Sequence, residues 1–316
     1  MKAMILAAGT GTRLRPLTAL RPKPLFPVYT VPLLQVTVNQ LVKAGVLEIM
    51  VNSHHLSRQI TDFLEHHTGS GASLSHSHEP DLLGTGGAIK QVEWFWGDQP
   101  FIVVNGDILH TVDLMQAYRT HMEQGNLATM VLHDYPRFNQ VEVDREGTIV
   151  GIRQKKVRET VSGTGMLAFT GIHIISPRLL DEIPSRRYVD IIDIYLDLAA
   201  RGLNIRGHRT RDHYWRDIGT PEDYHCIHRD IYQNRMRLAD TVTRPAPAAN
   251  GSAIGEGTTF GGYVSVGKNS RIGCNCSITD SIIWDNVSID DNCTIRNCII
   301  GDGASVKNSS ENNIFA

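Results

Sequence analysis

The last part of this chain repeats an apolar residue at intervals of six, and this spacing leaves few folds open. Glycine often follows the apolar residue, and two of the intervals are five residues long. A six-residue period of short strands predicts a left-handed β-helix, with three strands in each coil. We expect about three coils over 251–316. The repeating residues are Ile254, Phe260, Val266, Ile272, Ile278, Ile283, Ile289, Ile295, Ile300 and Val306.

Two consequences follow from this repeat. Hexapeptide coils are common in acyltransferases, which use a coil histidine as a base. No histidine follows His228 in this sequence, so acyl transfer is not expected. We expect the coils to mediate assembly of the chain into a homo-oligomer. A Pro/Ala-rich linker at 236–250 separates the coils from a larger domain at 1–235.

The domain at 1–235 begins as an alternation of strand and helix patterns, which predicts an α/β fold with a parallel sheet. Ligands in such sheets bind at the carboxyl ends of the strands. We expect the segments 8–23 and 84–87 and the residue Asp107 at that edge. The predicted strands are Met4–Ala8, Glu48–Asn52, Ser73–His78 and Phe101–Val104, and the predicted helices are Leu33–Ala44, Leu56–His66 and Gly84–Trp96.

From Leu127 the pattern changes to consecutive strands, which predicts an antiparallel insertion and so a mixed sheet. A helix near 189–201, a strand near 204–208 and a helix from Pro221 complete the domain. The predicted strands of the insertion are Leu127–His133, Gln140–Asp144, Thr148–Gln154 and Leu167–Ile175.

The first strand leads into a glycine turn in a strongly basic segment. No acidic residue precedes Glu48, whereas six lysines and arginines do. Glycines let backbone N–H groups approach phosphate oxygens, and the cations neutralise them. The turn Gly9-Thr-Gly11 is neither a dinucleotide fingerprint nor a P-loop, because the third glycine and the Gly-Lys-Ser/Thr ending are missing. It predicts a site for a highly charged phosphate.

Several blocks together resemble one enzyme family, the sugar-1-phosphate nucleotidyltransferases, over about the first 230 residues. These enzymes join a nucleoside triphosphate and a sugar 1-phosphate and release pyrophosphate. The resemblance implies a Rossmann-like, GT-A-like mixed α/β sheet, with coils similar to those of mannose-1-phosphate guanylyltransferases. The blocks are Leu6–Thr18, Arg21–Leu25, Gly84–Gly87, Val104–Asp107 and Trp215–Asp223.

The resemblance also implies roles for single residues. Arg13 would hold the β- and γ-phosphates, Lys23 would bridge the α-phosphate and the sugar phosphate, and Asp107 and Asp217 would bind Mg²⁺. The sugar phosphate is already an anionic nucleophile, so the reaction needs positioning and cations rather than a general base. Arg15 and Arg21 are expected at the surface. The expected nucleotide-binding residues are Leu6, Ala8, Gly9, Gly11, Thr12, Gly84, Thr85 and Gly87.

On the sugar side the sequence departs from the family. The usual Glu-Lys-Pro is Gln154-Lys155-Lys156, so Lys155 can pair with phosphate but the carboxylate is missing. Thr170 and Gly171 replace the family's Asn-Gly, which resembles muramate- or heptose-type enzymes. The block Leu83–Ile89 resembles guanylyltransferases. We expect GTP with a mannose- or heptose-type sugar 1-phosphate; the alternatives are uridylyl or thymidylyl transfer to another hexose 1-phosphate, or a catalytically silent nucleotide-sugar-binding regulatory subunit.

The composition bears on the partners and the cellular location that we expect for this protein. The net charge of −2 gives no general field for nucleic acid, and no apolar run approaches the length of a membrane span. None of the five cysteines occurs in the first 225 residues, which favours a reducing, cytoplasmic location over a disulfide framework. The cysteines within 274–298 are expected to pack inside the coils. The histidine pairs, such as His76 and His78, lack partners at the spacing of a zinc site.

Overall fold

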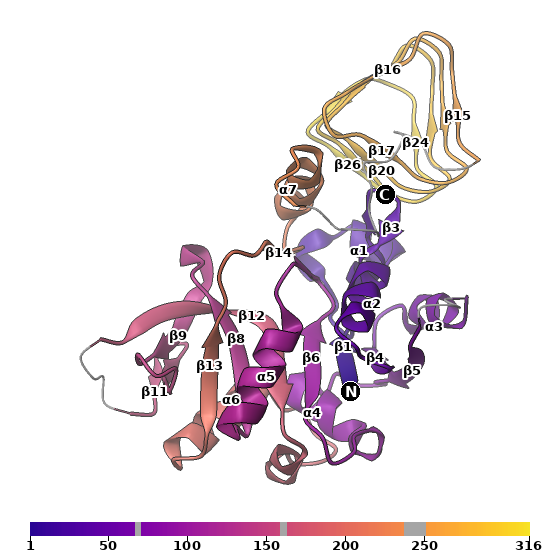
Figure 1. Cartoon of the computed structure of the whole chain (residues 1–316). Helices are drawn as coiled ribbons and strands as arrows, with labels where there is room; N and C mark the ends of the chain where they lie inside the picture. Colours follow the sequence, from indigo (N-terminus) through magenta and orange to yellow (C-terminus); the bar gives the residue numbers. More distant parts are fainter. Residues whose placement is uncertain (67–70, 159–162, 237–250) are drawn as a thin grey trace. The chain divides into compact units, whose positions relative to one another are not determined.

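The computed structural model describes residues 1–66, 71–158, 163–236 and 251–316 (Figure 1). Contacts divide the chain into two compact units. We call residues 1–9, 38–106 and 111–215 the sheet unit, and residues 10–37, 107–110 and 216–316 the coil unit. The basic loop and the residues around Asp107 thus group with the coils. Most of the predicted linker, 237–250, lies outside the described residues.

The sheet unit is built on four parallel strands in the order β6-β1-β4-β5. They are β1 (Lys2–Leu6), β4 (Glu48–Ser53), β5 (Ser73–His78) and β6 (Phe101–Asn105). The middle of β1, β4 and β6 is apolar and fully buried, as expected for strands covered on both faces. The parallel sheet predicted from the sequence is confirmed.

An antiparallel extension makes the sheet mixed. The long strand β12 (Gly165–Ile175) pairs antiparallel with β6, and its neighbours continue the sheet on its far side. The predicted mixed α/β fold is confirmed. The further strands are β8 (Ala128–His133), β9 (Asn139–Val143), β10 (Ile149–Ile152), β11 (Lys155–Lys156) and β13 (Ile205–Arg209).

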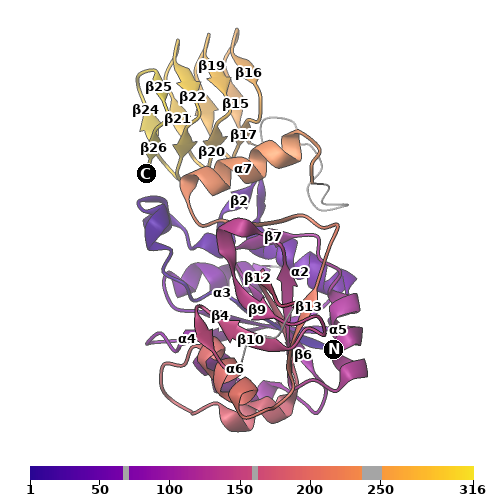
Figure 2. The same ribbon diagram turned by 90° about the vertical axis from the view of Figure 1, so that its left-hand side faces the viewer.

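Helices cover both faces of this sheet: α4 and α6 pack together on one side, and α5 lies on the other (Figure 2). Asp113 and Asp190 cap α5 and α6 by accepting a backbone N–H in the first turn. The predicted helix 84–96 is too long, because α4 ends at Gln91 and a short turn, η3 (Glu93–Phe95), follows. The helices are α3 (Ser57–His66), α4 (Gly84–Gln91), α5 (Leu114–Gln124) and α6 (Ile191–Ala200).

The coil unit begins with short elements of the basic loop. The helix α2 (Leu33–Lys43) starts in this unit and continues into the sheet unit. A longer helix, α7 (Pro221–Tyr232), has 12 residues. The short elements in this unit, or ending in it, are η1 (Thr12–Leu14), α1 (Leu17–Leu20), η2 (Lys23–Leu25), β2 (Pro27–Val28), β3 (Val31–Pro32), β7 (Ile108–His110) and β14 (Trp215–Asp217).

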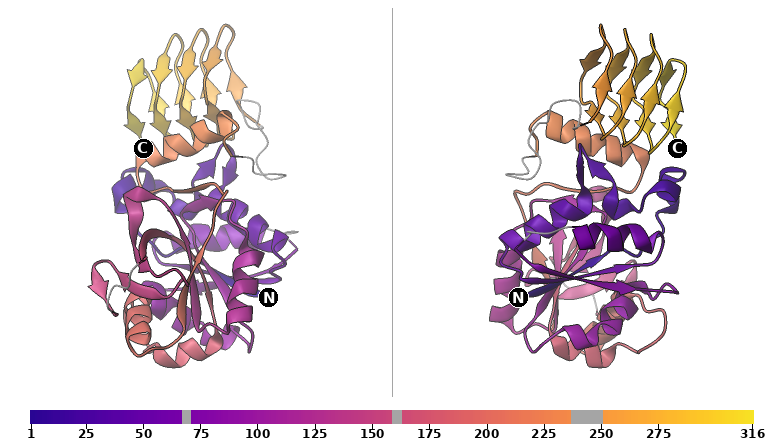
Figure 3. Two further views of the ribbon diagram at one scale, coloured as in Figure 1. Left: turned by 60° about the vertical axis from the view of Figure 1, so that its left-hand side comes forward. Right: turned by 90° about the vertical axis from the view of Figure 1, so that its right-hand side faces the viewer.

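The C-terminal residues form three parallel sheets of four short strands each, wound as the predicted left-handed β-helix (Figures 1 and 3). The apolar repeat stacks in register: Ile272 pairs with Ile254 on one side and Ile289 on the other. The strands are β15 (Ala253–Ile254), β16 (Thr259–Gly261), β17 (Ser265–Val266), β18 (Arg271–Ile272), β19 (Ser277–Thr279), β20 (Ile282–Ile283), β21 (Ser288–Ile289), β22 (Thr294–Arg296), β23 (Ile299–Ile300), β24 (Ser305–Val306), β25 (Ser310–Glu311) and β26 (Ile314–Phe315).

The prediction of about three coils was short by one set of strands. The last set is β24, β25 and β26, of which only β24 was covered by the predicted repeat, through Val306. The strand β25 was missed because Ser310 stands where the preceding coil has Ile295. The predicted packing of the cysteines inside the coils is confirmed for Cys276, Cys293 and Cys298, which are buried in the coil core as free thiols, but Cys274 is only half-buried and lies outside that core. Among the described residues, no helix is long and apolar enough to span a membrane.

Candidate functional site

The end of β1 and the turn that follows it contain five of the predicted nucleotide-binding residues. Leu6, Ala8 and Gly9 belong to the sheet unit, with Ala8 buried and Gly9 exposed. Gly11 and Thr12 belong to the coil unit. Gly11 has φ 62°, and a Cβ atom there would lie 2.8 Å from a methyl group of Thr18. Only glycine therefore fits this position of the turn.

The second glycine turn, which opens α4, packs closely against the backbone at Val189. Gly84 has φ 69°, and a Cβ atom there would lie 2.6 Å from the Val189 carbonyl oxygen. The N–H groups of Gly86 and Gly87 donate to that same oxygen, at 2.8 and 3.4 Å. The Thr85 hydroxyl accepts from the Ile191 N–H at 3.0 Å. These glycines thus let α4 begin directly beside the segment that leads into α6.

A buried carboxylate, not predicted from the sequence, joins the segments around the two turns. Glu79 is 1 % exposed and accepts from the Asn52 side chain at 2.6 Å and from the Leu83 N–H at 3.0 Å. Asn52 in turn accepts from the Ala7 N–H at 2.7 Å. This chain of bonds fixes the carboxyl end of β1 relative to the start of α4. The sequence signal was weak, because Asn52 lies near the end of β4 and Glu79 follows the mostly polar strand β5, and neither belongs to a recognisable motif.

The four predicted catalytic residues all belong to the coil unit. The Lys23 ammonium lies 3.2 Å from an oxygen of Asp107, and the Lys23 side chain is only 9 % exposed. The Asp107 carbonyl accepts from the Ile218 N–H at 2.8 Å, which sets β7 beside β14 and so places Asp217 on the neighbouring strand. At Gly219, an added Cβ atom would lie 2.5 Å from an Asp217 carboxylate oxygen and 3.4 Å from the Arg13 guanidinium. The four charged side chains are therefore gathered at one place.

Two further basic residues of this segment, Arg15 and Arg21, differ in their exposure and in their partners. Arg15 is exposed, as predicted. The prediction that Arg21 is a surface residue was wrong, because its guanidinium is paired with Asp285 and Asp302 of the coils. This pairing joins residues far apart in the sequence, so no local sequence pattern predicts it.

The four predicted sugar-phosphate-binding residues lie in the sheet unit, and the structure gives them no common partner among the described residues. Lys155 pairs with Asp193 at 2.9 Å and both side chains are exposed, while Gln154 is exposed with φ 66°. The Thr170 hydroxyl is buried and donates to the Val131 carbonyl at 2.8 Å. Gly171 has φ 79° and packs on Asn105 at the end of β6. The Thr170 hydroxyl is thus already committed within the protein.

Aromatic side chains gather at the end of β8, which runs parallel to β6. The rings of Tyr135, Phe138 and Trp215 contact one another at centroid distances of 5.4 to 6.0 Å, and His133 stacks on Tyr135. Burial lowers the pKa of His133 to about 4, so the ring is neutral at physiological pH. The half-buried rings offer an apolar face at the same edge of the sheet as Asn105. Sequence reasoning singled out only Trp215 among them.

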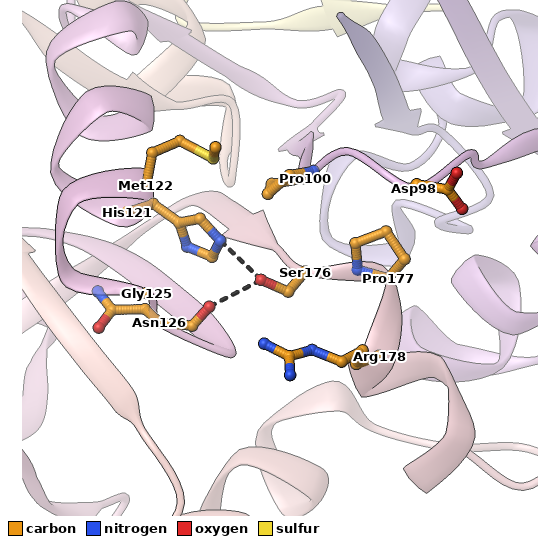
Figure 4. Close-up of a pocket in the computed structure, with 9 residues that line it drawn as sticks. All are labelled: Asp98, Pro100, His121, Met122, Gly125, Asn126, Ser176, Pro177 and Arg178. Carbon is orange, nitrogen blue, oxygen red and sulfur yellow. Dashed lines mark hydrogen bonds between the residues drawn. The ribbon is translucent and has the colours of Figure 1, made fainter.

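A cavity of about 390 Å³ lies elsewhere in the sheet unit (Figure 4). It is lined by Pro100, which precedes β6, and by Ser176, which follows β12. It therefore lies at the opposite ends of these strands from Gly106. His121 donates to or accepts from Ser176 and Thr129 inside it, and burial lowers its pKa to about 4. The cavity contains none of the predicted site residues.

Comparison with known proteins identifies the family of this chain. The family model described as nucleotidyl transferase matches residues 2–234. The chain belongs to the nucleotidyl transferase family. A second family model, the GMPPB C-terminal domain, matches residues 243–313 and so covers the coils.

Curated relatives span most of the chain. It is 31 % identical to a UTP–glucose-1-phosphate uridylyltransferase of Synechocystis, over 86 % of this chain and 75 % of that protein. It is 35 % identical to an N-acetylmuramate alpha-1-phosphate uridylyltransferase of Neisseria meningitidis, over 70 % of this chain and 94 % of that protein. It is 27 % identical to a mannose-1-phosphate guanylyltransferase of Mycobacterium tuberculosis, over 91 % and 81 % respectively.

A solved structure agrees on the fold. A protein of Bacillus anthracis assigned as a glucose-1-phosphate thymidylyltransferase superposes with a TM-score of 0.62 at 23 % identity, over 72 % of this chain and 93 % of that one. Because the family model and these relatives agree, this protein is an enzyme of the sugar-1-phosphate nucleotidyltransferase class.

Proposed function

We propose that this enzyme transfers a guanylyl group from GTP to a mannose- or heptose-type sugar 1-phosphate and releases pyrophosphate. The observation that carries the catalytic part is the grouping of Arg13, Lys23, Asp107 and Asp217 in one compact unit. Two cations and two carboxylates so arranged suit a reaction that joins two polyanions.

The two carboxylates fit a magnesium ion. Asp107 immediately precedes β7 and Asp217 ends β14, the strand that pairs with β7. Mg²⁺ is held in proteins by one or two carboxylates together with substrate phosphates. Asp107 and Asp217 would hold it. When bound, Mg²⁺ supplies positive charge that neutralises the phosphates and the leaving pyrophosphate.

The transfer step itself would depend on Lys23 and Arg13. An oxygen of the sugar phosphate attacks the α-phosphorus, the new P–O bond forms, and the bond from the α-phosphorus to the β-bridging oxygen breaks. No proton moves, because the nucleophile is already an anion. Lys23, held by Asp107, orients the two reacting phosphates, and Arg13 stabilises charge on the departing β- and γ-phosphates.

Two pairs of nucleotide and sugar 1-phosphate are candidate substrates. The match of the GMPPB C-terminal domain and the guanylyltransferase relatives that span both parts of the chain support GTP and a mannose-type sugar. The uridylyltransferase relatives have higher identity, 31 % over 86 % of this chain and 35 % over 70 % of it, which keeps UTP with a glucose- or muramate-type sugar as the second candidate. The aromatic group around Trp215 would pack against a face of either sugar.

We further propose that the coils assemble the chain into a homo-oligomer and that the enzyme works in the cytoplasm on free nucleotide and sugar 1-phosphate. Light scattering of the purified protein tests the assembly. A monomeric mass across the working concentration range would contradict it.

The experiment that tests the function is a grid of pyrophosphate release with Mg²⁺. The nucleotides are GTP, UTP, dTTP, CTP and ATP, and the sugars are the 1-phosphates of glucose, mannose, heptose, N-acetylglucosamine and N-acetylmuramate. Highest activity with GTP and mannose or heptose supports the first candidate, and highest activity with UTP supports the second. A folded protein that binds nucleotide sugars but stays silent across the grid would contradict catalysis and favour a regulatory subunit.

A further inference from the structure

Lys23 lies in a stretch of chain that is attached to the β-helix on both sides. We call residues 21–29 the Lys23 segment; it belongs, like the coils and α7, to the coil unit. One attachment is at Arg21, two residues before Lys23, and the other is at Phe26 and Pro27, just after it. Each attachment joins parts of the chain that are roughly two hundred or more residues apart.

The first attachment is an ion-pair network. The Arg21 guanidinium donates to both oxygens of Asp302, at 2.9 and 2.6 Å, and to Asp285 at 3.0 Å. The two carboxylates belong to successive coils, and the Asp285 N–H itself donates to Asp302 at 3.1 Å. The Arg21 guanidinium also lies 5.1 Å from the ring centre of Trp284. Bidentate, half-buried pairs of this kind hold geometry better than exposed ion pairs.

The second attachment is aromatic and fully buried. The ring of Phe26 meets Trp284 edge-on at 4.7 Å and Tyr224 at 5.5 Å. The Trp284 indole donates to the Tyr224 hydroxyl at 3.2 Å, and that hydroxyl donates to the Pro27 carbonyl. Figure 2 shows α7, which carries Tyr224, lying along the coils above β2. Trp284 thus takes part in both attachments.

Between the attachments the chain forms one tight turn, η2. The Leu25 N–H donates to the Pro22 carbonyl at 2.8 Å, and the Phe26 N–H donates to the Lys23 carbonyl at 2.9 Å. Two prolines, Pro22 and Pro24, restrict the backbone further. A displacement of Arg21 is therefore passed to Lys23 rather than absorbed between them.

We propose that the β-helix is a positioning element of the reaction, and that it sets the Lys23 ammonium against Asp107 through the contacts of Arg21 with Asp285 and Asp302. Arg21 is then a positioning residue that touches no substrate. The inference rests on the proposed function for the role of Lys23, but not for the mechanical link between the coils and the segment.

The link itself can be measured without substrates, by hydrogen exchange at the Leu25 and Phe26 amides. Arg21→Gln and Asp285→Asn each remove contacts to the coils and should speed this exchange by about tenfold, the expected scale for losing a charge-assisted bond. The matched control is Asp291→Asn. Asp291 accepts the Cys274 N–H at 2.7 Å just as Asp285 accepts the Lys268 N–H at 2.8 Å, and among the described residues it pairs with no basic side chain.

The catalytic consequence is tested by a double-mutant cycle. Arg21→Gln should lower kcat about tenfold with little change in KM, and Arg21→Lys should restore part of the loss. Combined with Lys23→Gln, Arg21→Gln should cause no further loss, because it acts through Lys23. If Arg21→Gln does not fold, Asp285→Asn takes its place in the cycle, because it removes only the bond between Arg21 and Asp285.

Several outcomes would overturn the inference. One is equal exchange at Leu25 and Phe26 in Asp285→Asn, Asp291→Asn and the unaltered protein. Another is a cycle in which the losses from Arg21→Gln and Lys23→Gln multiply. Failure of the proposed function looks different, because then no substrate pair is turned over while the exchange difference between the two aspartate variants remains.

Discussion

At the scale of single residues, the buried carboxylate of Glu79 is a point of the sheet unit where a small change should be costly, because both of its oxygens accept hydrogen bonds. Glu79→Gln replaces one of two accepting oxygens by an amide NH₂, which would face a donor on Asn52 or Leu83. A buried donor without an acceptor costs about 1–3 kcal/mol. We predict a loss of about 2 kcal/mol in the free energy of unfolding and a higher KM for the nucleotide.

Glu93→Gln is the matched control for this prediction. Glu93 pairs with Lys90 at 2.7 Å on a partly exposed surface, so its loss should cost less than about 1 kcal/mol. Urea unfolding and nucleotide KM are measured for both variants. Equal effects of the two substitutions would contradict the network as a determinant of the nucleotide turn.

The residues differ in how far the sequence could predict them. Arg13, Lys23, Asp107 and Asp217 are charged groups beside glycine or proline blocks, and the structure gathers them in one unit. The roles given to them remain predictions. Arg21 was placed wrongly, because its partners are 264 and 281 residues away and nothing local distinguishes it from Arg15.

At the scale of elements, the close approach of α4 to Val189 makes Gly84 irreplaceable. Gly84→Ala forces an L-residue into φ 69° and places its Cβ atom 2.6 Å from a backbone oxygen. The conformational cost alone is about 1 kcal/mol, and the overlap adds to it. We predict a loss of at least about 1 kcal/mol in the free energy of unfolding and weaker nucleotide binding.

Gly97→Ala serves as the control, because a Cβ atom there would have no atom within 4 Å and the backbone is not left-handed. It should leave both the free energy of unfolding and nucleotide binding nearly unchanged. The measurements are urea unfolding and nucleotide titration by calorimetry. Unchanged stability in Gly84→Ala would contradict the packing argument.

Elements with a strong period were predictable, and irregular ones were not. The β-helix strands follow directly from stacked residues such as Ile272, because the six-residue period and the coil geometry are the same property. The end of α4 was missed because Trp96 leaves the helix to stack on Phe101 at 3.7 Å and to bond the Ile89 carbonyl. Tertiary packing, rather than local propensity, ends that helix.

At the scale of the whole molecule, buried neutral histidines make stability depend on pH. Burial lowers the pKa of His173 and His228 to about 3 and that of His121, His133 and His225 to about 4. The unfolded chain takes up these protons near pH 6.5, whereas the folded chain does not. Stability is therefore greatest above about pH 6.5 and falls as the pH drops toward 4.

We predict a lower urea midpoint at pH 5.5 than at pH 7.5, with each such histidine contributing up to about 1.4 kcal/mol per pH unit. His228→Gln, which can still donate to the Pro27 carbonyl, should show a smaller shift of the midpoint. His66→Gln, at an exposed site, should keep the full shift. Identical shifts in the two variants would contradict the argument.

The division of the chain into domains at 1–235 and 251–316 stays a prediction. By contacts, the basic loop, α7 and the coils group as one unit, and the sequence did not suggest this grouping. That grouping arises from buried pairs such as Trp284 with Phe26 and Tyr263 with His225, which have no signature in a local pattern.

We propose that the carboxylates of Asp107, which pairs with Lys23, and of Asp217 support nucleotidyl transfer. The most direct measurement is pyrophosphate release with Mg²⁺ by the unaltered enzyme, Asp107→Asn and Asp217→Asn, each shown to be folded by circular dichroism. We predict a loss of at least about a hundredfold in kcat for each variant. Turnover within a few-fold of the unaltered enzyme in both variants would contradict the assignment.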